Sequence, residues 1–392
     1  MPLIHALKNL MGKAGLCIIS ALVLSGCWKR DSADPYEANP SPAEPTEADA
    51  LAVEMFCHVV EQGQGNVVFS PASVEVVLHA LCEGAAGQTR KELAALPYGK
   101  QGVASAMQVE SATAVFADNA LKLKPDSIPV RRAPFTAAPG KALKCVNAWC
   151  DKKTHGKIPS ILSEMPSHTR LLALNAVCLK GKWLRPFEPT RTENHDFHLR
   201  DGSIVQVTMM REEPELLYAK GEDWQAVALF YRTDGRPGEP GCFIGILPRG
   251  DARAFAAKLT PQKFNAIRAA LAKSGFETTE VYLPRFEVNC AAISLAPALR
   301  ALGVKSAFSP QEANFAGMAE EPLYLSDVLQ KCHVKVDEQG TEAAAATEGI
   351  LCEFIAYPKE RRVIRFDRPF LWVIGDLSTD APPYFMGLVE KP

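Results

Sequence analysis

Two histidines, His195 and His198, have a spacing that could contribute to a metal site. A zinc site needs three or four nitrogen, sulfur or carboxylate ligands close together. No further Cys or His lies near these two, and the run alternates like a strand that leads into a turn at Asp201 and Gly202. The favoured interpretation is a solvated strand, and no metal is expected.

The sequence also lacks the patterns of the common enzyme classes. It has no G-x-S-x-G elbow, no H-E-x-x-H helix, and no Walker or G-x-G-x-x-G loop. Lone histidines such as His79 and His155 are more often hydrogen-bonded structural groups than catalytic bases. These absences argue against an enzyme, and no cofactor is expected.

Composition excludes a further class of function. The 392 residues are 47% hydrophobic and 22% charged, with a formal net charge of -2, which describes an ordinary globular protein. A protein that neutralises nucleic-acid phosphates needs an excess of Lys and Arg. No nucleic-acid partner is therefore expected.

The 11 cysteines do not form a disulfide framework. Their spacing is irregular, and Cys17 and Cys27 belong to the N-terminal segment, which leaves an odd number in a large domain. Cys145 and Cys150 fall on one expected helix but do not face each other. Most of the others lie in apolar runs, where a thiol behaves as a small core hydrophobe. This group is Cys82, Cys178, Cys242, Cys290 and Cys332.

The N-terminus has the pattern of an export signal. Lys8 and Lys13 precede an apolar run over residues 14–24, which is too short for a membrane span and suits a signal peptide. The run ends in Leu-Ser-Gly-Cys27, which resembles the bacterial lipobox, and a plain secretory signal with a chance Cys is the alternative. The resemblance implies a lipoprotein signal peptide over 1–26 and lipidation of Cys27. Two or three acyl chains, at roughly 0.8 kcal/mol per buried methylene, would anchor the protein to a membrane.

Residues 27–48 are predicted to be the lipid anchor and a disordered linker. They are rich in Pro, Glu, Ala and Ser and have almost nothing to bury. Trp28 follows Cys27 where an Asp would argue for inner-membrane retention. The expected location is therefore the outer membrane or cell surface, facing the periplasm or the exterior.

The folded body is predicted over residues 49–392. Helical periodicity covers residues 50–62, 73–84, 89–95, 145–153 and 260–274, and Ser70 or Ser73 can cap the second of these helices. Strand patterns cover residues 111–116, 171–179, 225–231, 242–247, 280–288, 323–336, 363–366, 370–376 and 384–389. Helices dominate early and strands late without βαβ alternation, which indicates an α+β domain.

Several motifs occur in the order typical of one family. Residues 66–73 (NVVFSPAS) resemble the segment that opens helix B of serpins, and residues 146–158 resemble helix F with its exit. Residues 174–187 resemble the central strand and its crossover, 336–344 (VDEQGTEAA) the hinge, and 368–370, 385–387 and Pro392 the C-terminal strands. The resemblance implies the serpin fold: one domain with a large central mixed β-sheet, further sheets, surrounding helices and an exposed reactive-centre loop at about 338–362.

The chain departs from the family at three points. Residues 97–108 are short where serpins carry two helices, so helix D is expected to be missing or vestigial. Gln330 stands where serpins often have a His, and it can bridge Asn175 and Ser73 by hydrogen bonds. The segment that follows the expected cleavage site in the reactive-centre loop is about four residues longer than in well-known serpins.

The resemblance implies two polar clusters that control opening of the sheet. At the breach, where loop insertion begins, Arg285 and Glu338 are expected to form an ion pair beside Trp183. Lower down lies the shutter, for which ordinary buried hydrogen bonding is the plain alternative and is compatible with the role. The expected shutter residues are Ser70, Ser73, Asn175 and Gln330.

The loop has a sequence that could enter a sheet as a strand. Alternate side chains of a strand point to opposite faces. From Thr341, one phase (341, 343, 345, 347, 349, 351) is small or apolar, whereas both charges, Glu342 and Glu348, lie on the other. An Ala-rich surface helix is the alternative, although so short a helix is marginal alone. The hinge residues are taken as Glu338, Gly340, Thr341, Ala343 and Ala345.

In serpins the hinge glutamate is counted as the seventeenth residue before the cut, so the resemblance, with Glu338 in that place, implies a reactive bond at Phe354-Ile355. Phe suits a deep apolar specificity pocket, so a chymotrypsin-like or cathepsin-G-like serine protease is the expected partner. Bonds after Leu351, Cys352 or Tyr357 stay open as alternatives.

The first hypothesis is therefore a monomeric, suicide-type serine protease inhibitor, not an enzyme. The protease would be trapped as an acyl-enzyme when the cut loop inserts over roughly fourteen residues, a displacement of about 46 Å. One alternative is a non-inhibitory serpin that acts as a surface binding protein. Another is an inhibitor of a cysteine protease that uses the same loop.

Overall fold

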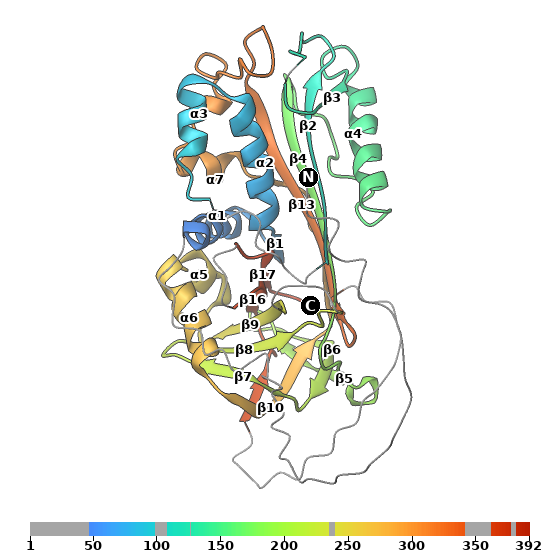
Figure 1. The fold of residues 1–392 in the computed structure, drawn as a ribbon. Helices are drawn as coiled ribbons and strands as arrows, with labels where there is room; N and C mark the ends of the chain where they lie inside the picture. The colour runs from blue at the N-terminus through green and yellow to red at the C-terminus, as the bar shows by residue number, and fades with distance from the viewer. Residues whose placement is uncertain (1–46, 99–107, 126, 235–239, 342–361, 378–381) are drawn as a thin grey trace, which may run out of the picture. The chain divides into compact units, whose positions relative to one another are not determined.

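The computed structural model describes residues 47–98, 108–125, 127–234, 240–341, 362–377 and 382–392. Within these ranges, helices precede most of the strands, and the predicted α+β class is confirmed (Figure 1). None of the helices in these ranges is both long and apolar enough to cross a membrane. The expected signal peptide, Cys27 and the linker up to residue 46 lie outside the described part, as do residues 99–107, where helix D was expected to be missing or vestigial. The last two residues predicted as disordered linker, 47 and 48, instead begin the first helix, α1 (Glu47–Gln62).

The large mixed sheet predicted from the sequence is present. Its order is β11-β13-β14-β4-β2-β3, and β12 also pairs with β13. β4 and β13 pair in parallel, as do β2 and β3, and the other pairs are antiparallel. The strands are β2 (Gln108–Asp118), β3 (Val130–Ala133), β4 (Leu171–Lys182), β11 (Phe286–Val288), β12 (Ile293–Ser294), β13 (Leu325–Asp337) and β14 (Gly340–Thr341).

β4 is the central strand of this sheet because both of its faces are buried. Residues 171–179 are all buried, as expected for a continuous apolar run. Its even-numbered side chains join a cluster with helix α4 (Pro139–Lys153), which lies alongside β2 and β3 (Figure 1). Leu171 and Ala173 join a second cluster on the other face, and Val177 and Leu179 join a third.

A second sheet packs on the third cluster. Its order is β1-β17-β16-β9-β8-β7-β10-β6-β5, with β15 beside β10. Its strands are β1 (Val67–Phe69), β5 (Glu193–His198), β6 (Ile204–Glu212), β7 (Glu215–Lys220), β8 (Trp224–Phe230), β9 (Cys242–Pro248), β10 (Phe276–Pro284), β15 (Arg362–Arg365), β16 (Phe370–Gly375) and β17 (Phe385–Val389).

The remaining helices surround the second apolar cluster of the core. They are α1 (Glu47–Gln62), α2 (Pro71–Gly84), α3 (Gly87–Ala94), α5 (Ala252–Ala257), α6 (Pro261–Lys273) and α7 (Ala296–Ala301). Thr260 caps α6 by accepting a hydrogen bond from the Lys263 amide. Ser70 occupies the cap position of α2, but its side chain makes no capping bond, so the expected cap is wrong.

Two predicted elements differ from the structure by more than a few residues at their ends. α4 begins at Pro139 rather than at 145, since a proline suits the first turn of a helix. The strand predicted over 280–288 is two strands, β10 and β11, which lie in different sheets and meet at Arg285. His195 and His198 lie in β5, as the strand interpretation predicted, and Gly202 turns with a φ of 84°.

The described cysteines are free thiols. Cys178, Cys242 and Cys332 are buried, as predicted for small core hydrophobes, whereas Cys82 and Cys290 are half-buried. Burial raises the pKa of the Cys150 thiol to about 12. Cys145 on the same helix is exposed, so these two do not face each other.

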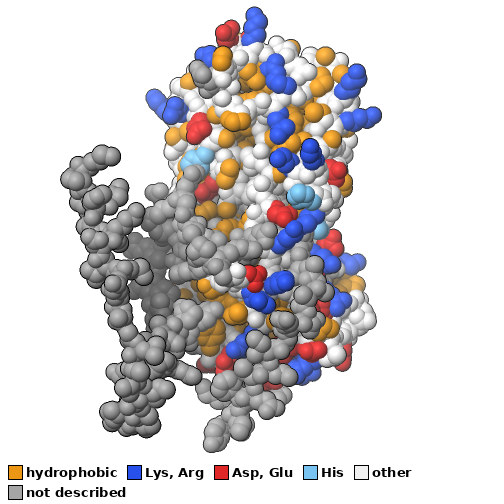
Figure 2. Space-filling model, turned by 45° about the vertical axis from the view of Figure 1, so that its right-hand side comes forward, with side chains coloured by type: hydrophobic (Ala, Val, Ile, Leu, Met, Phe, Trp, Pro, Cys, Tyr) orange, Lys and Arg blue, Asp and Glu red, His pale blue; other side chains and the backbone are white. Residues whose placement is uncertain are grey.

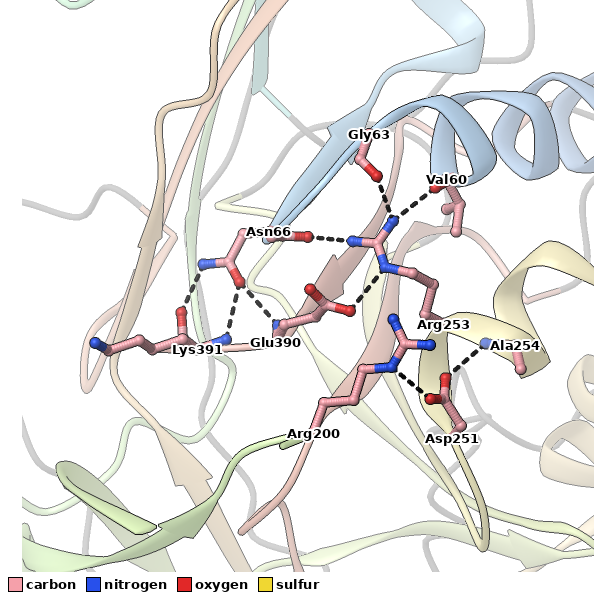
Figure 3. A network of polar contacts seen from close by, with 10 residues as sticks. Val60, Gly63, Asn66, Arg200, Asp251, Arg253, Ala254, Glu390 and Lys391 are labelled. Carbon is pink, nitrogen blue, oxygen red and sulfur yellow. Dashed lines mark hydrogen bonds and ion pairs between the residues drawn. The ribbon is translucent and has the colours of Figure 1, made fainter. Parts of the chain in front are cut away.

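The C-terminal end is tied to the end of α1 by a polar network (Figure 3). The Arg253 guanidinium donates to the carbonyls of Val60 and Gly63 at 2.6 and 2.8 Å and pairs with Glu390 at 2.7 Å. A cation at these carbonyls satisfies groups that the helix end leaves without a partner. Asn66 accepts from the Glu390 amide at 2.8 Å, so α1, α5 and the last residues form one unit.

Candidate functional site: the hinge and two polar clusters

Two residues near the start of the predicted loop already lie inside the large sheet. Gly340 and Thr341 form β14, which pairs with β13 on one side and with Gly181 and Lys182 of β4 on the other. Gly340 has a φ of 146°, and a Cβ there would lie 2.0 Å from the Gly181 carbonyl oxygen. Only glycine fits this position, because both the backbone angle and the space exclude a side chain.

Thr341 is anchored by an aromatic stack. Its hydroxyl lies 2.7 Å from that of Tyr231, and both residues are fully or almost fully buried. Burial raises the pKa of Tyr231, so its hydroxyl stays protonated. Tyr231 stacks on Trp183 at 4.6 Å, and the Trp183 indole donates to the Asp337 carbonyl at 2.9 Å. The predicted breach residue Trp183 therefore holds both ends of the hinge hairpin.

Glu338 and Arg285 form a forked ion pair in the breach. Arg285 Nε lies 2.7 and 2.8 Å from the two Glu338 oxygens, and Thr192 donates to Oε1 at 2.7 Å. Burial by itself would raise the pKa of Glu338, but the hydrogen bonds from Arg285 and Thr192 hold that pKa below its usual value. The carboxylate is buried, whereas half of the Arg285 side chain is exposed.

The predicted shutter is a chain of neutral hydrogen bonds between β4, β13 and α2. The Gln330 side chain donates to Asn175 Oδ1 at 2.8 Å and to the Ser70 carbonyl at 2.9 Å, and it accepts from the Ser70 amide at 2.8 Å. Asn175 Nδ2 in turn donates to Ser111 and Thr113 at 3.3 and 3.0 Å. Gln330, Asn175 and Ser70 are completely buried.

One expected contact of the shutter is wrong. Gln330 reaches Asn175 but contacts the backbone of Ser70 rather than the side chain of Ser73. Ser73 lies one turn into α2 and donates to Ser111 instead, at 3.2 Å. Gln330 can bind Ser70 because its amide carries both a donor and an acceptor.

The shutter lies at the boundary between two apolar clusters. On the same face of β4 as Asn175, Ala173 belongs to the second cluster and Val177 to the third. On β13, Val328 and Cys332 flank Gln330 in the same way. The polar groups thus interrupt the core along one line across the sheet, where the parallel β4–β13 pair is held by side chains as well as backbone.

Sequence reasoning missed four partners of these clusters. Tyr231 and Thr192 come from other strands and loops, and no local pattern points to them. Ser111 and Thr113 did carry a signal, since they are polar residues two apart in an otherwise apolar strand and therefore share a face. The predicted residues Ala343, Ala345, Phe354 and Ile355 lie outside the described part of the chain.

The described residues of the hinge, breach and shutter include no cluster of side chains that could bind a metal ion. Across the described ranges, no three His, Cys, Asp or Glu side chains come together in a way that could hold an ion. The role of this arrangement is structural. It holds β14 between β13 and β4, and these two strands pair directly with each other further along the sheet.

Known proteins resemble this chain along most of its length. A family model described as serpin (serine protease inhibitor) matches residues 46–392. A serine protease inhibitor of Cyanea capillata is 29% identical over 376 residues, which cover 87% of this chain and 97% of that protein. An uncharacterised serpin-like protein of Thermococcus kodakarensis is 30% identical over 357 residues, with coverage of 83% and 81%.

Solved structures share the fold. The native thermophilic serpin tengpin matches with a TM-score of 0.75 at 23% identity, covering 88% of this chain and 93% of that one. Thyroxine-binding globulin in complex with thyroxine matches with a TM-score of 0.74 at 20% identity, covering 89% and 99%. Serpins are mostly protease inhibitors rather than enzymes, and some do not inhibit. With a family model that spans both polar clusters and the hinge, the chain belongs to the serpin family.

Proposed function

We propose that this serpin is a suicide inhibitor of a chymotrypsin-like or cathepsin-G-like serine protease, with Phe354-Ile355 as the reactive bond. The observation that carries the proposal is the position of β14 between β13 and β4. Because Gly340 and Thr341 of the loop already occupy that gap, the loop needs no new nucleation step to enter the sheet further.

The pairing of β4 with β13 supports strand insertion. These strands run parallel from residues 171–178 and 325–333. An inserted segment that continues from β14 would run antiparallel to both, as β14 does. It would replace one parallel ladder by two antiparallel ladders, which adds backbone hydrogen bonds and uses the slightly more stable pairing. The cut loop thus has a free-energy reason to insert.

The covalent step requires only the chemistry of the protease. Its serine oxygen attacks the carbonyl carbon of Phe354, the bond to the Ile355 nitrogen breaks, and the serine proton passes through the protease histidine to that nitrogen. The products are an ester between Phe354 and the serine and a new amino group on Ile355. Insertion before water hydrolyses the ester would leave the protease attached.

The C-terminal fragment has contacts that would retain it after the cut. It contains β15, β16 and β17, which pair with β10, β9 and β1. Asn66 and Arg253 hold Glu390 through the network of Figure 3. We expect this fragment to separate only under denaturing conditions.

The test is incubation of the full chain with chymotrypsin, followed by a denaturing gel and mass spectrometry. The expected result is a covalent band at the summed mass and a C-terminal fragment that begins at Ile355. If chymotrypsin, cathepsin G, elastase, subtilisin and trypsin all cleave without a complex, the inhibitor proposal fails and a binding role, as for the thyroxine-binding relative, replaces it. A complex with papain alone would instead favour a cysteine-protease inhibitor.

A matched pair of variants tests whether insertion does the trapping. Thr341→Arg places a charge on a side chain that is completely buried beside Tyr231, so we expect cleavage without a complex. Glu342→Arg changes the opposite phase of the loop and should keep the complex. If the two variants trap equally well, insertion along this phase is not the mechanism.

We also propose that Cys27 is lipidated and attaches the inhibitor to the outer membrane or cell surface. The support is the Leu-Ser-Gly-Cys run and the linker that follows it. Mass spectrometry of the N-terminal peptide from a bacterial membrane fraction should find an acylated Cys27. An unmodified N-terminus, or an unchanged membrane fraction after Cys27→Ser, would refute the anchor.

A further inference from the structure

A pocket of about 360 Å³ lies at one edge of the second sheet. Its walls come from the edge strand β5, from β6, β10 and β15, and from the link between β15 and β16. Ligand pockets in proteins measure roughly 300–1,000 Å³, so this pocket suits a small molecule. None of its lining residues belongs to the hinge, the breach or the shutter.

Backbone hydrogen bonds fix the walls of this pocket. β5 pairs with β6, and β15 pairs with β10. The His198 amide donates to the Asp367 carbonyl at 2.7 Å, which ties the end of β5 to the chain beyond β15. Tyr282 and Met209 line the pocket as buried side chains. The pocket is therefore built from regular elements and needs no rearrangement to form.

Arg365 presents a positive charge without a counter-ion. Its guanidinium carbon lies 3.5 Å from the centroid of the Tyr282 ring, which covers one face of the planar group. Among the described residues, no carboxylate lies within ion-pair distance of Arg365. The N–H groups point outward in the plane of the guanidinium, so the ring leaves them able to donate. A guanidinium held in this way is ready for a bidentate bond to a carboxylate.

Two neighbouring arginines differ from Arg365 in this respect. Arg211 lies 5.6 Å from the same ring and pairs with Glu280 at 2.6 Å. Arg362, on the same strand as Arg365, pairs with Glu277 at 2.6 Å. These two ion pairs already hold β6 and β15 to β10. Attachment of the strands therefore does not explain the charge of Arg365.

A carboxylate on the other side of the pocket is also without a counter-ion. Asp196 of β5 accepts a hydrogen bond from the neutral Gln206 amide on β6. Within the described ranges, no Lys, Arg or His side chain lies within ion-pair distance of Asp196. Asp367, the other acid of the pocket, pairs with Arg368 at 3.1 Å. The pocket thus offers one uncompensated charge of each sign.

Two imidazoles add further hydrogen-bonding groups. His195 meets the Tyr282 ring edge-on, with centroids 5.7 Å apart, and His198 ends the same strand. A neutral imidazole carries one donor and one acceptor, so each ring can bind either end of a polar ligand. The two rings do not converge with a third ligand on a metal position in the part of the chain that the structure describes.

The surface of this half of the molecule has no patch of a single charge. Over the lower half of Figure 2, where the second sheet lies, acidic and basic side chains lie next to one another outside the grey segments. A docking surface for a polyanion needs a concentration of Lys and Arg instead. The mixed charge favours a small ligand that carries both signs.

We propose that this pocket binds a small zwitterion with an apolar side chain, of the class of free amino acids. The carboxylate of the ligand binds the Arg365 guanidinium, its ammonium group binds Asp196, and its side chain packs on Tyr282 and Met209. A simple anion would meet the Asp196 carboxylate without compensation, and a simple cation would meet Arg365. The proposal does not depend on protease inhibition.

The test titrates the full chain with L-phenylalanine by calorimetry at neutral pH. Two analogues of nearly the same shape each lack one charge: phenylpropanoate has no ammonium group, and phenylethylamine has no carboxylate. We expect L-phenylalanine to bind and each analogue to bind about tenfold more weakly, because each loses a charge-assisted hydrogen bond. Equally tight binding of either analogue would overturn the proposal, as would the absence of binding at an amino-acid concentration of about 10 mM.

Matched variants assign the binding to this pocket. Arg365→Gln and Asp196→Asn each remove one charge and should each weaken binding of L-phenylalanine about tenfold. In Asp196→Asn, phenylpropanoate and L-phenylalanine should bind equally well, since the ammonium group has lost its partner. Arg90→Gln on α3 and Asp151→Asn on α4 make the same charge changes at exposed positions and should alter Kd less than about twofold.

Equal effects of the pocket variants and the control variants would contradict the assignment. Thermal unfolding verifies that each variant folds. Asp196 is exposed on an edge strand, and an Asn there can still accept from Gln206, so this variant tests the pocket even if Arg365→Gln does not fold. The two analogues test the unaltered chain independently of any variant.

Discussion

The breach and the shutter hold the same two strands together by different means. The breach combines a forked ion pair, an aromatic stack and a strand that is already inserted. The shutter consists of neutral hydrogen bonds among fully buried side chains. Half of Arg285 is in contact with solvent, whereas Asn175 and Gln330 have no access to water.

This difference determines where the sheet can open. Separating the breach returns an arginine to water, which solvates it well, so the cost is small. Separating the shutter leaves buried amides without partners until another strand supplies them, which costs about 1–3 kcal/mol for each unsatisfied group. We therefore expect strand entry to begin at the breach and to be resisted at the shutter.

The largest effect is expected from breaking the shutter at its centre. Asn175→Ala removes the acceptor of Gln330 and the donor to Ser111 and Thr113, and leaves a small cavity. We expect a loss of about 3 kcal/mol in the free energy of unfolding, measured by urea titration. Thr113→Val removes one of these bonds and should cost about 1 kcal/mol. Equal losses would contradict the prediction, because they would mean that the bonds of Asn175 to Gln330 and Ser111 add nothing beyond its bond to Thr113.

The second effect tests whether the inserted hinge contributes to the breach. In Gly340→Ala the new Cβ would meet the Gly181 carbonyl at 2.0 Å, so β14 must leave the sheet. We expect a loss of about 2 kcal/mol and a change in the fluorescence of Trp183, whose stacking partner binds the hinge. Gly202→Ala is the control: its φ is also positive, but no atom lies within 4 Å of the new Cβ. It should cost about 1 kcal/mol without the fluorescence change.

The sequence predicted the fold better than the partners within the two clusters. The run 171–179 is apolar apart from Asn175, and its length favours a buried strand. The resemblance of several motifs to the serpin family implied the breach and shutter residues. Side-chain contacts depend on three-dimensional placement instead. Tyr231 meets Thr341 across 110 residues of chain, and one turn of α2 decides that Ser70, not Ser73, reaches Gln330.

The same limit applies to Arg285. The sequence around Arg285 predicted a single strand over residues 280–288, because the apolar pattern of β10 continues into β11. The chain instead passes from one sheet to the other at this residue, and its amide donates to the Thr208 carbonyl at 2.9 Å. That transfer between sheets points Arg285 at Glu338, and no local pattern encodes it.

A smaller effect separates the ion pair from the rest of the breach. Glu338→Gln keeps the shape but loses the charge, and we expect a loss of about 1 kcal/mol at pH 7, since Arg285 is half exposed. Because the folded pKa of Glu338 is depressed, its contribution is fully present above the unfolded value of 4.5 and is lost as pH falls through the folded value. The difference between the two proteins should therefore shrink from pH 6 to pH 3.5. A difference that stays constant would show that charge is not involved.

The smallest effect probes the hydroxyl contact at the hinge. Tyr231→Phe keeps the stack on Trp183 but removes the group that lies 2.7 Å from the Thr341 hydroxyl. One buried hydroxyl loses its partner, so we expect a loss of about 1 kcal/mol, smaller than that of Asn175→Ala because backbone pairing still holds β14. The double variant Tyr231→Phe, Thr341→Val removes both hydroxyls and should recover most of the loss. If the double variant is as unstable as the sum of the single ones, the two hydroxyls do not interact, and the hinge is held by its backbone and by Gly340 alone.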